Sequence, residues 1–301
     1  MILNPFIYQS GGGGSGPILL ITVTGATPSS VVATKSGASV SLAYDSTAGK
    51  WWAVLPSTGT WTVTAYRADE YSKSVTVNAA NVTVYETSIR LTDLPDGYTE
   101  LSYIELSGGQ YINTNLSFPN GFRIQEEIEV ADNNNNVLFG STKSYWNDCG
   151  IYTGTSDVAN SKRLYILGAT AAKHTISNTF LPNTRYSVDI CNRGNMADAF
   201  AIINENNFAL ENYTTGNFGY GSIILYLFSG NRTSDTGTPT IFLKGKAYGR
   251  IKIYDSTDTS NLKRDYCPAR NSSNVIGYYD FVSSTFFTNA GTGSFIAGPE
   301  V

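Results

Sequence analysis

Cysteine and histidine are scarce in this chain, and their scarcity limits the chemistry available to it. The 301 residues include one histidine, His174, and three cysteines, Cys149, Cys191 and Cys267. An odd number of widely spaced cysteines is atypical of a disulfide-stapled domain, so we expect buried thiols. A single histidine excludes a metal site built from several histidines. The polar segment around His174 shows no nucleophile motif and indicates a structural or surface role.

Charged residues and long apolar runs are also scarce. Charged residues make up 15% of the chain, and 20 basic residues against 24 acidic ones give a net charge of −4. Without a basic excess, we expect no nucleic-acid partner. No apolar run approaches the roughly 18–20 residues of a membrane-spanning helix, so we expect no membrane insertion. The abundant aromatic, Gly, Ser, Thr and Asn residues are instead typical of many short strands joined by polar turns.

The first sixteen residues combine an apolar peptide with a glycine-rich segment. No Lys or Arg precedes the apolar residues and Pro5 interrupts them, which is atypical of a secretory signal. Gly11, Gly13 and Gly16 have G-x-G-x-x-G spacing, but Pro17 opens a strand pattern where a dinucleotide-binding loop needs a helix. We interpret residues 1–16 as an anchor peptide on a flexible tether, whose glycine run is either native or left by cloning. The residues expected to dock into a partner protein are Met1, Ile2, Leu3, Phe6, Ile7 and Tyr8.

Residues 17–93 contain strand-like runs separated by turn signals about every ten residues, which predicts a sandwich of about seven strands. In TWTVTAY, Trp61, Val63 and Ala65 alternate with threonines, so one face is apolar. The segment GKWWAVLPSTGTWTVTA resembles the Gly-x-Trp…Leu-Pro…Gly-Thr-Trp-x-Val pattern of immunoglobulin-like and carboxypeptidase-regulatory-like sandwich domains. That resemblance implies a spacer without catalytic residues.

The turn cluster Leu94-Pro95-Asp96-Gly97 is a plausible domain boundary, and residues 94–301 continue as strands without a helical period. We predict an all-β chain, in which a small immunoglobulin-like sandwich precedes a larger two-sheet jelly-roll sandwich. In FRIQEEIEV, the residues at 122, 124, 128 and 130 form an apolar face that Glu126 interrupts, and Arg123, Gln125, Glu127 and Glu129 occupy the other face. We expect this strand to lie at a solvated edge.

Both ends of this larger region resemble one family. The opening GYTELSYIELSGGQYINTNLSFPNGFRIQEEIEV and the tail CPARNSSNVIGYYDFVSSTFFTNAGTGSFIAGPEV resemble those of concanavalin-like, laminin-G-like lectin and glucanase sandwiches of phage and bacterial surface proteins. The resemblance implies a two-sheet jelly roll and binding of a glycan or surface ligand. It fixes neither the ligand nor a binding residue.

Glycosidases of this fold carry an E-x-D-x-x-E arrangement on one strand face, with one carboxylate as nucleophile and one as acid. The nearest match is Glu127-x-Glu129-x-x-Asp132, in which the second and third acids are exchanged. We therefore interpret these residues as a solvated face and predict that the protein is not an enzyme. No cofactor is expected, although oxygen ligands for calcium occur at Asp132 with residues 133–136 and at Asp148 with Asn147.

The segment STKSYWNDCGIYTG combines aromatic and polar residues outside a regular strand. Tyr145 and Trp146 can stack on a sugar ring, and Asn147 and Asp148 can bond its hydroxyl groups. The alternative, in which Trp146 closes one end of the sandwich, remains open. These residues are the candidate ligand site for a glycan on a cell surface.

A lectin-like, spacer-like chain without a secretion signal or disulfides suits a protein made in bacterial cytoplasm and released on a phage particle. We expect a homo-oligomeric structural or adhesive protein of the virion, on capsid or tail. A bacterial surface adhesin and a polysaccharide-cleaving glycosidase are the alternatives.

Overall fold

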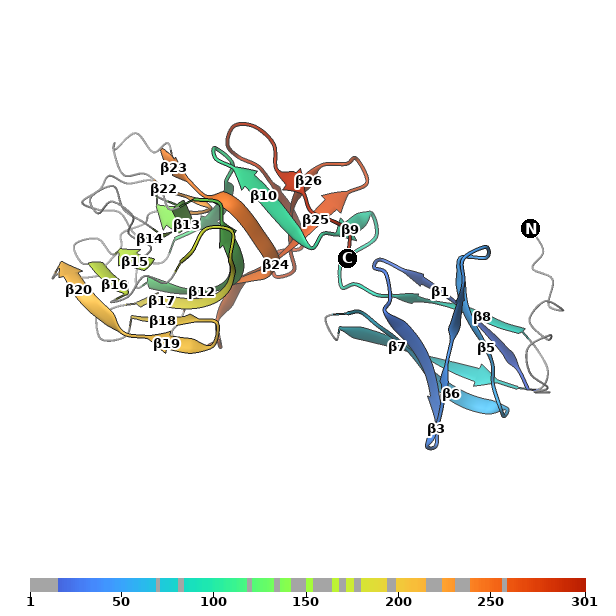
Figure 1. Cartoon of the computed structure of the whole chain (residues 1–301). Helices are drawn as coiled ribbons and strands as arrows, with labels where there is room; N and C mark the ends of the chain where they lie inside the picture. Colours follow the sequence, from blue (N-terminus) through green and yellow to red (C-terminus); the bar gives the residue numbers. More distant parts are fainter. Residues whose placement is uncertain are drawn as a thin grey trace. The chain divides into compact units, whose positions relative to one another are not determined.

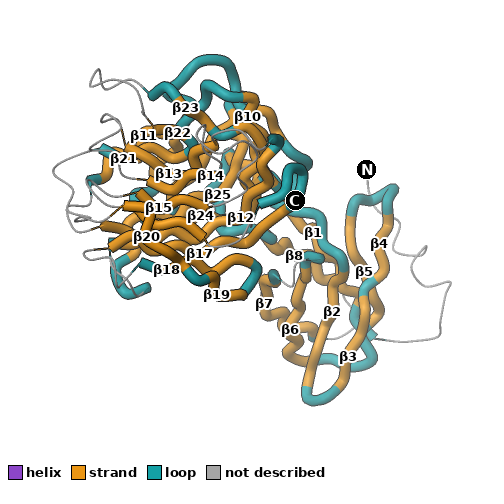
Figure 2. Tube along the Cα trace, turned by 60° about the vertical axis from the view of Figure 1, so that its left-hand side comes forward, coloured by secondary structure: helices purple, strands orange, loops and turns teal. Residues whose placement is uncertain are grey.

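The computed structural model describes most of the chain, with gaps in its loops. The described residues are 16–68, 71–80, 84–117, 121–132, 136–141, 150–153, 164–167, 172–175, 180–193, 199–214, 224–230, 239–255 and 259–301. Every regular element in these ranges is a strand, and Figure 2 shows no helix in them. The predicted all-β class is therefore confirmed. The described residues include no helix that could cross a membrane.

The chain folds as two compact units, which divide between Glu100 and Leu101, and Val301 belongs to the first unit. The boundary lies somewhat later than the sequence-based boundary between residues 93 and 94. The strands of the first unit are β1 (Ile18–Thr24), β2 (Ser30–Lys35), β3 (Ala38–Ser41), β4 (Ala43–Asp45), β5 (Lys50–Val54), β6 (Gly59–Tyr66), β7 (Ser72–Ala79), β8 (Val84–Arg90) and β9 (Tyr98–Glu100).

The first unit is built from two four-stranded sheets, ordered β4-β5-β1-β8 and β3-β2-β6-β7. Strand β6 buries Trp61, Val63 and Ala65 completely, as its alternation predicts, and these side chains share one core with Leu19 and Ile21 of β1. Leu42 is buried in the same core and lies between β3 and β4. Membership of an immunoglobulin-like family stays a prediction.

The second unit contains the remaining strands, coloured from green to red along the chain in Figure 1. They are β10 (Tyr103–Ser107), β11 (Ile112–Leu116), β12 (Gly121–Val130), β13 (Asn136–Ser141), β14 (Gly150–Thr153), β15 (Leu164–Leu167), β16 (Ala172–Thr175), β17 (Arg185–Arg193), β18 (Phe200–Ile203), β19 (Asn206–Phe208), β20 (Leu210–Thr214), β21 (Leu225–Leu227), β22 (Ser229–Gly230), β23 (Ile241–Phe242), β24 (Lys244–Tyr254), β25 (Leu262–Asn271), β26 (Ile276–Asp280), β27 (Thr285–Thr288) and β28 (Ile296–Ala297).

Two large sheets and a small two-stranded sheet, β22-β23, make up this unit. One large sheet follows the path β19-β18-β17-β12-β24-β25-β26-β27, with β10 paired to β24, and the other large sheet is ordered β11-β21-β13-β14-β15-β16-β20. Both contribute to a single hydrophobic core, in which Phe122 of β12 packs edge-on against Phe139 of β13 at a ring distance of 4.5 Å. The predicted two-sheet sandwich is therefore present, since side chains from both inner faces bury one another.

Strand β12 lies in the interior of its sheet, between β17 and β24 (Figure 1). The expectation of an edge strand was wrong, because β17 and β24 are distant in sequence and pair with it from both sides. Its two faces are as predicted: Phe122, Ile124, Ile128 and Val130 are buried, as is Glu126. The four alternate side chains of β12 thus point outward from the middle of a wide sheet.

Candidate functional site

The outward face of β12, β17 and β24 carries paired charges and amides, and we call it the outer polar face. It consists of Arg123, Gln125, Glu127 and Glu129 of β12, Arg185, Ser187 and Asp189 of β17, and Lys246, Tyr248, Arg250, Lys252 and Tyr254 of β24. Strand alternation places these residues on one face, and antiparallel register sets them side by side. The face is therefore a property of three strands that meet only in the folded chain.

Asp189 is the centre of the first group on this face. Arg123 donates two hydrogen bonds to its carboxylate, from Nε to Oδ1 at 2.7 Å and from Nη2 to Oδ2 at 2.5 Å. Gln125 Nε2 donates to the same Oδ2 at 2.9 Å, and Tyr254 Oη donates to Gln125 Oε1 at 2.9 Å. A bidentate guanidinium–carboxylate pair has a fixed geometry, so the amide of Gln125 is held in one orientation.

Glu129 is the centre of the second group. Its carboxylate accepts hydrogen bonds from Lys246 Nζ and Tyr248 Oη, both at 2.9 Å. Next to it, Glu127 forms an ion pair with Arg185, whose guanidinium lies 4.3 Å from the centre of the Tyr248 ring. Cation–π contact and ion pairing therefore hold the acidic and basic side chains in register across three strands.

The electrostatics of this second group bear on the glycosidase alternative. Partial burial acts to raise the pKa of Glu129, but the hydrogen bonds from Lys246 and Tyr248 outweigh it and leave that pKa below its ordinary value. A glycosidase acid needs a raised pKa so that it holds a proton to donate. Glu129 therefore lacks the environment of a general acid, and Glu127 forms an ion pair with Arg185.

A hollow of about 400 Å³ opens on the outer polar face beside the first group. Its lining includes Gln125 and Glu127 of β12, Ser187 and Asp189 of β17, Lys252 of β24 and Ile202 of β18. Arg250, which also lines it, donates from Nε to Asp265 Oδ1 at 2.8 Å. The hollow offers oriented polar groups around a small apolar patch, an arrangement that suits a polyhydroxylated or charged ligand.

Several residues singled out from the sequence lie outside the described residues. They are the candidate ligand residues Tyr145, Trp146, Asn147 and Asp148, and the anchoring residues Met1, Ile2, Leu3, Phe6, Ile7 and Tyr8. Their assignments stay predictions. Cys191 and Cys267 are both buried, as expected, and Cys149 is a further residue that the structure does not describe.

The structure describes Asp132 and Asn136 of the candidate calcium ligands, whereas Asn147 and Asp148 lie outside the described residues. Asn136 Nδ2 donates to the backbone oxygen of Asp132 at 3.1 Å, as in an ordinary turn, and residues 133–135 lie outside the described ranges. Within the described ranges, His, Cys, Asp and Glu side chains form no group of three or more that could hold a metal ion.

Sequence reasoning found the β12 side of the outer polar face and missed the rest. The alternation in RYSVDI and KAYGRIKIY marks Arg185, Asp189 and Lys246 as outward, but alternation does not reveal which strands become neighbours. The partners of Glu127 and Glu129 lie on strands far away in sequence, so no local signal could have identified them.

Comparison with known proteins gives distant likenesses. No family model matches the chain, and no curated protein matches it in sequence. Among solved structures, a putative carbohydrate binding protein from Bacteroides ovatus is 13% identical with a TM-score of 0.45, over 99% of this chain and 87% of that one. The CBM40 of Ruminococcus gnavus IT-sialidase is 11% identical with a TM-score of 0.39, over 54% and 94%. Mouse laminin alpha1 domains LG4-5 are 10% identical with a TM-score of 0.35, over 78% and 80%. Likeness at this level carries no functional assignment.

Proposed function

We propose that this chain is a non-enzymatic adhesive protein of a phage particle, and that its second unit binds glycans on a host cell or in the environment. The observation that carries the glycan-binding part is the outer polar face with its hollow of about 400 Å³. Saccharides are recognised by hydrogen-bonding groups held in fixed directions beside apolar or aromatic surface. Gln125, Asp189 and Ile202 supply these features side by side.

The proposal that the chain is not an enzyme rests on the environments of the Glu127 and Glu129 carboxylates. Glu129, with its lowered pKa, serves better as a fixed acceptor than as a proton donor, and Glu127 is held in an ion pair. A sugar-release assay on β-glucans and cell-wall polysaccharide tests this directly. We expect no turnover, and turnover that Glu129→Gln removes would establish the glycosidase alternative.

The location on a virion extends the sequence-based expectation. An apolar peptide at residues 1–8 beside a glycine-rich segment suits attachment to another virion protein, and the second unit then serves as the exposed head. Copurification of the chain with assembled particles is the expected result. Its recovery from bacterial envelopes in the absence of particles would favour the bacterial adhesin.

Glycan binding itself is tested with the full chain on an array of bacterial surface saccharides. We expect binding that Asp189→Asn weakens, because this change removes the charge that orients both Arg123 and Gln125. Asp96→Asn, an exposed carboxylate in the first unit, is the matched control. Failure of the wild-type chain to bind any saccharide would overturn the proposal.

A further inference from the structure

The hollow on the outer polar face contains two charges that the fold does not neutralise. Most charged residues in its lining have a charged partner: Asp189 pairs with Arg123, Glu127 with Arg185, and Arg250 with Asp265. Lys252 and Glu205 differ, because neither side chain forms a hydrogen bond or an ion pair with any residue that the structure describes. Glu126 also borders the hollow, but it is buried inside the unit. The hollow therefore presents one ammonium and one carboxylate available to a ligand.

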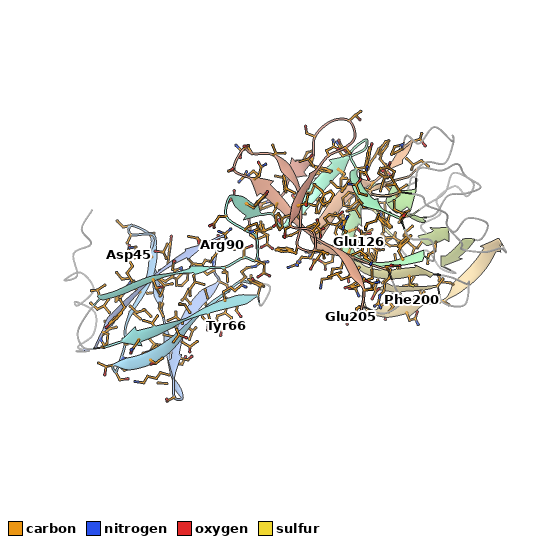
Figure 3. All side chains as sticks on the ribbon, turned by 180° about the vertical axis from the view of Figure 1, so that it is seen from behind. Asp45, Tyr66, Arg90, Glu126, Phe200 and Glu205 are labelled. Atoms are coloured by element: carbon orange, nitrogen blue, oxygen red, sulfur yellow. The ribbon has the colours of Figure 1, made fainter. Side chains whose placement is uncertain are left out.

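The two charges lie at opposite sides of the hollow. Lys252 of β24 is directly opposite Gln125 of β12, which is opposite Asp189 of β17, which is opposite Ile202 of β18. Three strand spacings of about 4.8 Å place the backbones of Lys252 and Ile202 roughly 14 Å apart. Glu205 belongs to the turn that follows β18 and lines the hollow, on the side remote from Lys252. Figure 3 labels it near Phe200 of β18.

The backbone at Glu205 is unusual for a residue with a side chain. Asn204 and Glu205 have φ angles of 48° and 64°, the left-handed pair of a tight hairpin turn between β18 and β19. Glycine is preferred at the second position of such a turn, because a side chain there is strained by the left-handed backbone. Asn204 has a local role, since its Oδ1 accepts a hydrogen bond from the backbone N–H of Ser187 at 2.9 Å. The described structure gives the Glu205 carboxylate no such role.

We propose that this hollow binds a zwitterionic saccharide, whose repeating unit carries an ammonium group and a carboxylate or phosphate group. The ammonium lies against Glu205 and the anion against Lys252, while Gln125, Asp189 and Ser187 bond the hydroxyl groups between them. A ligand with both charges satisfies both free groups, whereas a neutral or singly charged saccharide leaves at least one of them unpaired. This inference rests on the proposed function and specifies its ligand class.

The test uses saccharides of equal length that differ in charge. De-N-acetylated hyaluronan hexasaccharide carries alternating ammonium and carboxylate groups, the parent N-acetylated hexasaccharide carries only carboxylates, and chitosan hexasaccharide carries only ammonium groups. Calorimetric titration of the full chain is expected to show about tenfold tighter binding of the zwitterionic form than of either other form. Equal affinity for the three forms would overturn the inference.

Single-residue variants test which charge of the ligand lies against Lys252 and which lies against Glu205. Lys252→Gln is expected to remove the preference over chitosan, and Glu205→Gln the preference over the N-acetylated form. Glu205→Gly removes the same carboxylate while relieving the backbone, so its melting temperature should match or exceed that of the wild type and exclude misfolding as the cause. Glu105→Gln and Lys244→Gln, whose residues do not line the hollow, are controls and should bind as the wild type does.

The outcomes separate this inference from the proposed function. If the wild type binds a saccharide and the Glu205 and Lys252 variants bind it equally well, glycan binding stands and the hollow is not its site. If the wild type binds neither these hexasaccharides nor any arrayed glycan, the proposed function fails as well.

Discussion

Glu126 places a carboxyl group inside the core of the second unit. Figure 3 labels it among the side chains of the second unit. It is 3% exposed, and neither carboxyl oxygen has a hydrogen-bond partner among the described residues. Burial raises its pKa to about 8, because a carboxylate loses its hydration there without an ion pair to replace it. Burial also raises the pKa of the nearby Tyr278, and the charge of Glu126 raises it further. Glu126 is thus protonated at neutral pH.

This buried acid makes stability fall as pH rises. Above pH 4.5 the unfolded chain has released the Glu126 proton, whereas the folded chain keeps it until about pH 8. The folded state binds more protons in this window, so the free energy of unfolding decreases by roughly 5 kcal/mol between these limits. Glu126→Gln should remove that dependence, as measured by urea unfolding from pH 4 to 9. An equal slope in wild type and variant would show that other groups cause it.

At the scale of elements, the pairing of β12 with β24 depends on a glycine. Gly245 has a φ of 147° and lies opposite Val130, and a Cβ atom there would come within 1.8 Å of the backbone oxygen of Glu129. A side chain can fit only if the two strands separate. The adjacent pair in the same two strands is Glu129 and Lys246, which belong to the second group of the outer polar face.

Gly245→Ala should therefore destabilise the second unit by about 2 kcal/mol or more, since it adds a backbone clash to an unfavourable φ. Gly49→Ala is the matched control: Gly49 also has a positive φ, 66°, but no heavy atom lies within 4 Å of its added Cβ. We expect about 1 kcal/mol for the control. Equal losses of unfolding free energy in denaturant titrations would contradict the proposed clash.

Strand β12 also shows which structural features could be predicted from the sequence and which could not. The alternation in FRIQEEIEV correctly predicted both faces, including the inward Glu126, because period-2 patterning is local. The position of β12 in the middle of its sheet could not be predicted. Sheet order is set by pairing between distant segments, and β24 reaches β12 only after more than a hundred intervening residues. The ion pairs of Glu127 and Glu129 could not be predicted either, because their partners also lie on strands distant in sequence.

At the scale of the whole molecule, two candidate sites compete for the ligand. One is the hollow on the outer polar face, and the other is the sequence segment with Tyr145 and Trp146, which lies outside the described residues. If the segment is a stacking platform, Trp146→Ala should abolish glycan binding with little change in melting temperature. If Trp146 instead fills the end of the sandwich, the loss is about 3–5 kcal/mol of stability. A large drop in melting temperature, or unchanged binding, would reject the platform.

The last prediction concerns attachment. Residues 1–8 are mainly apolar and are followed by a glycine-rich segment, a composition that suits a peptide which orders only on its partner. Deletion of Met1–Gly16 should leave the strand content and melting temperature of both units unchanged, because the two cores are formed by residues from Leu19 onward. The deletion should nevertheless abolish incorporation into assembled particles, measured by quantitative blotting of purified virions. Replacing residues 11–16 with a Ser-rich segment of equal length is the control and should preserve incorporation, since a tether needs length and flexibility rather than glycine itself. Normal occupancy of particles by the truncated chain would instead mean that attachment resides in one of the two β units.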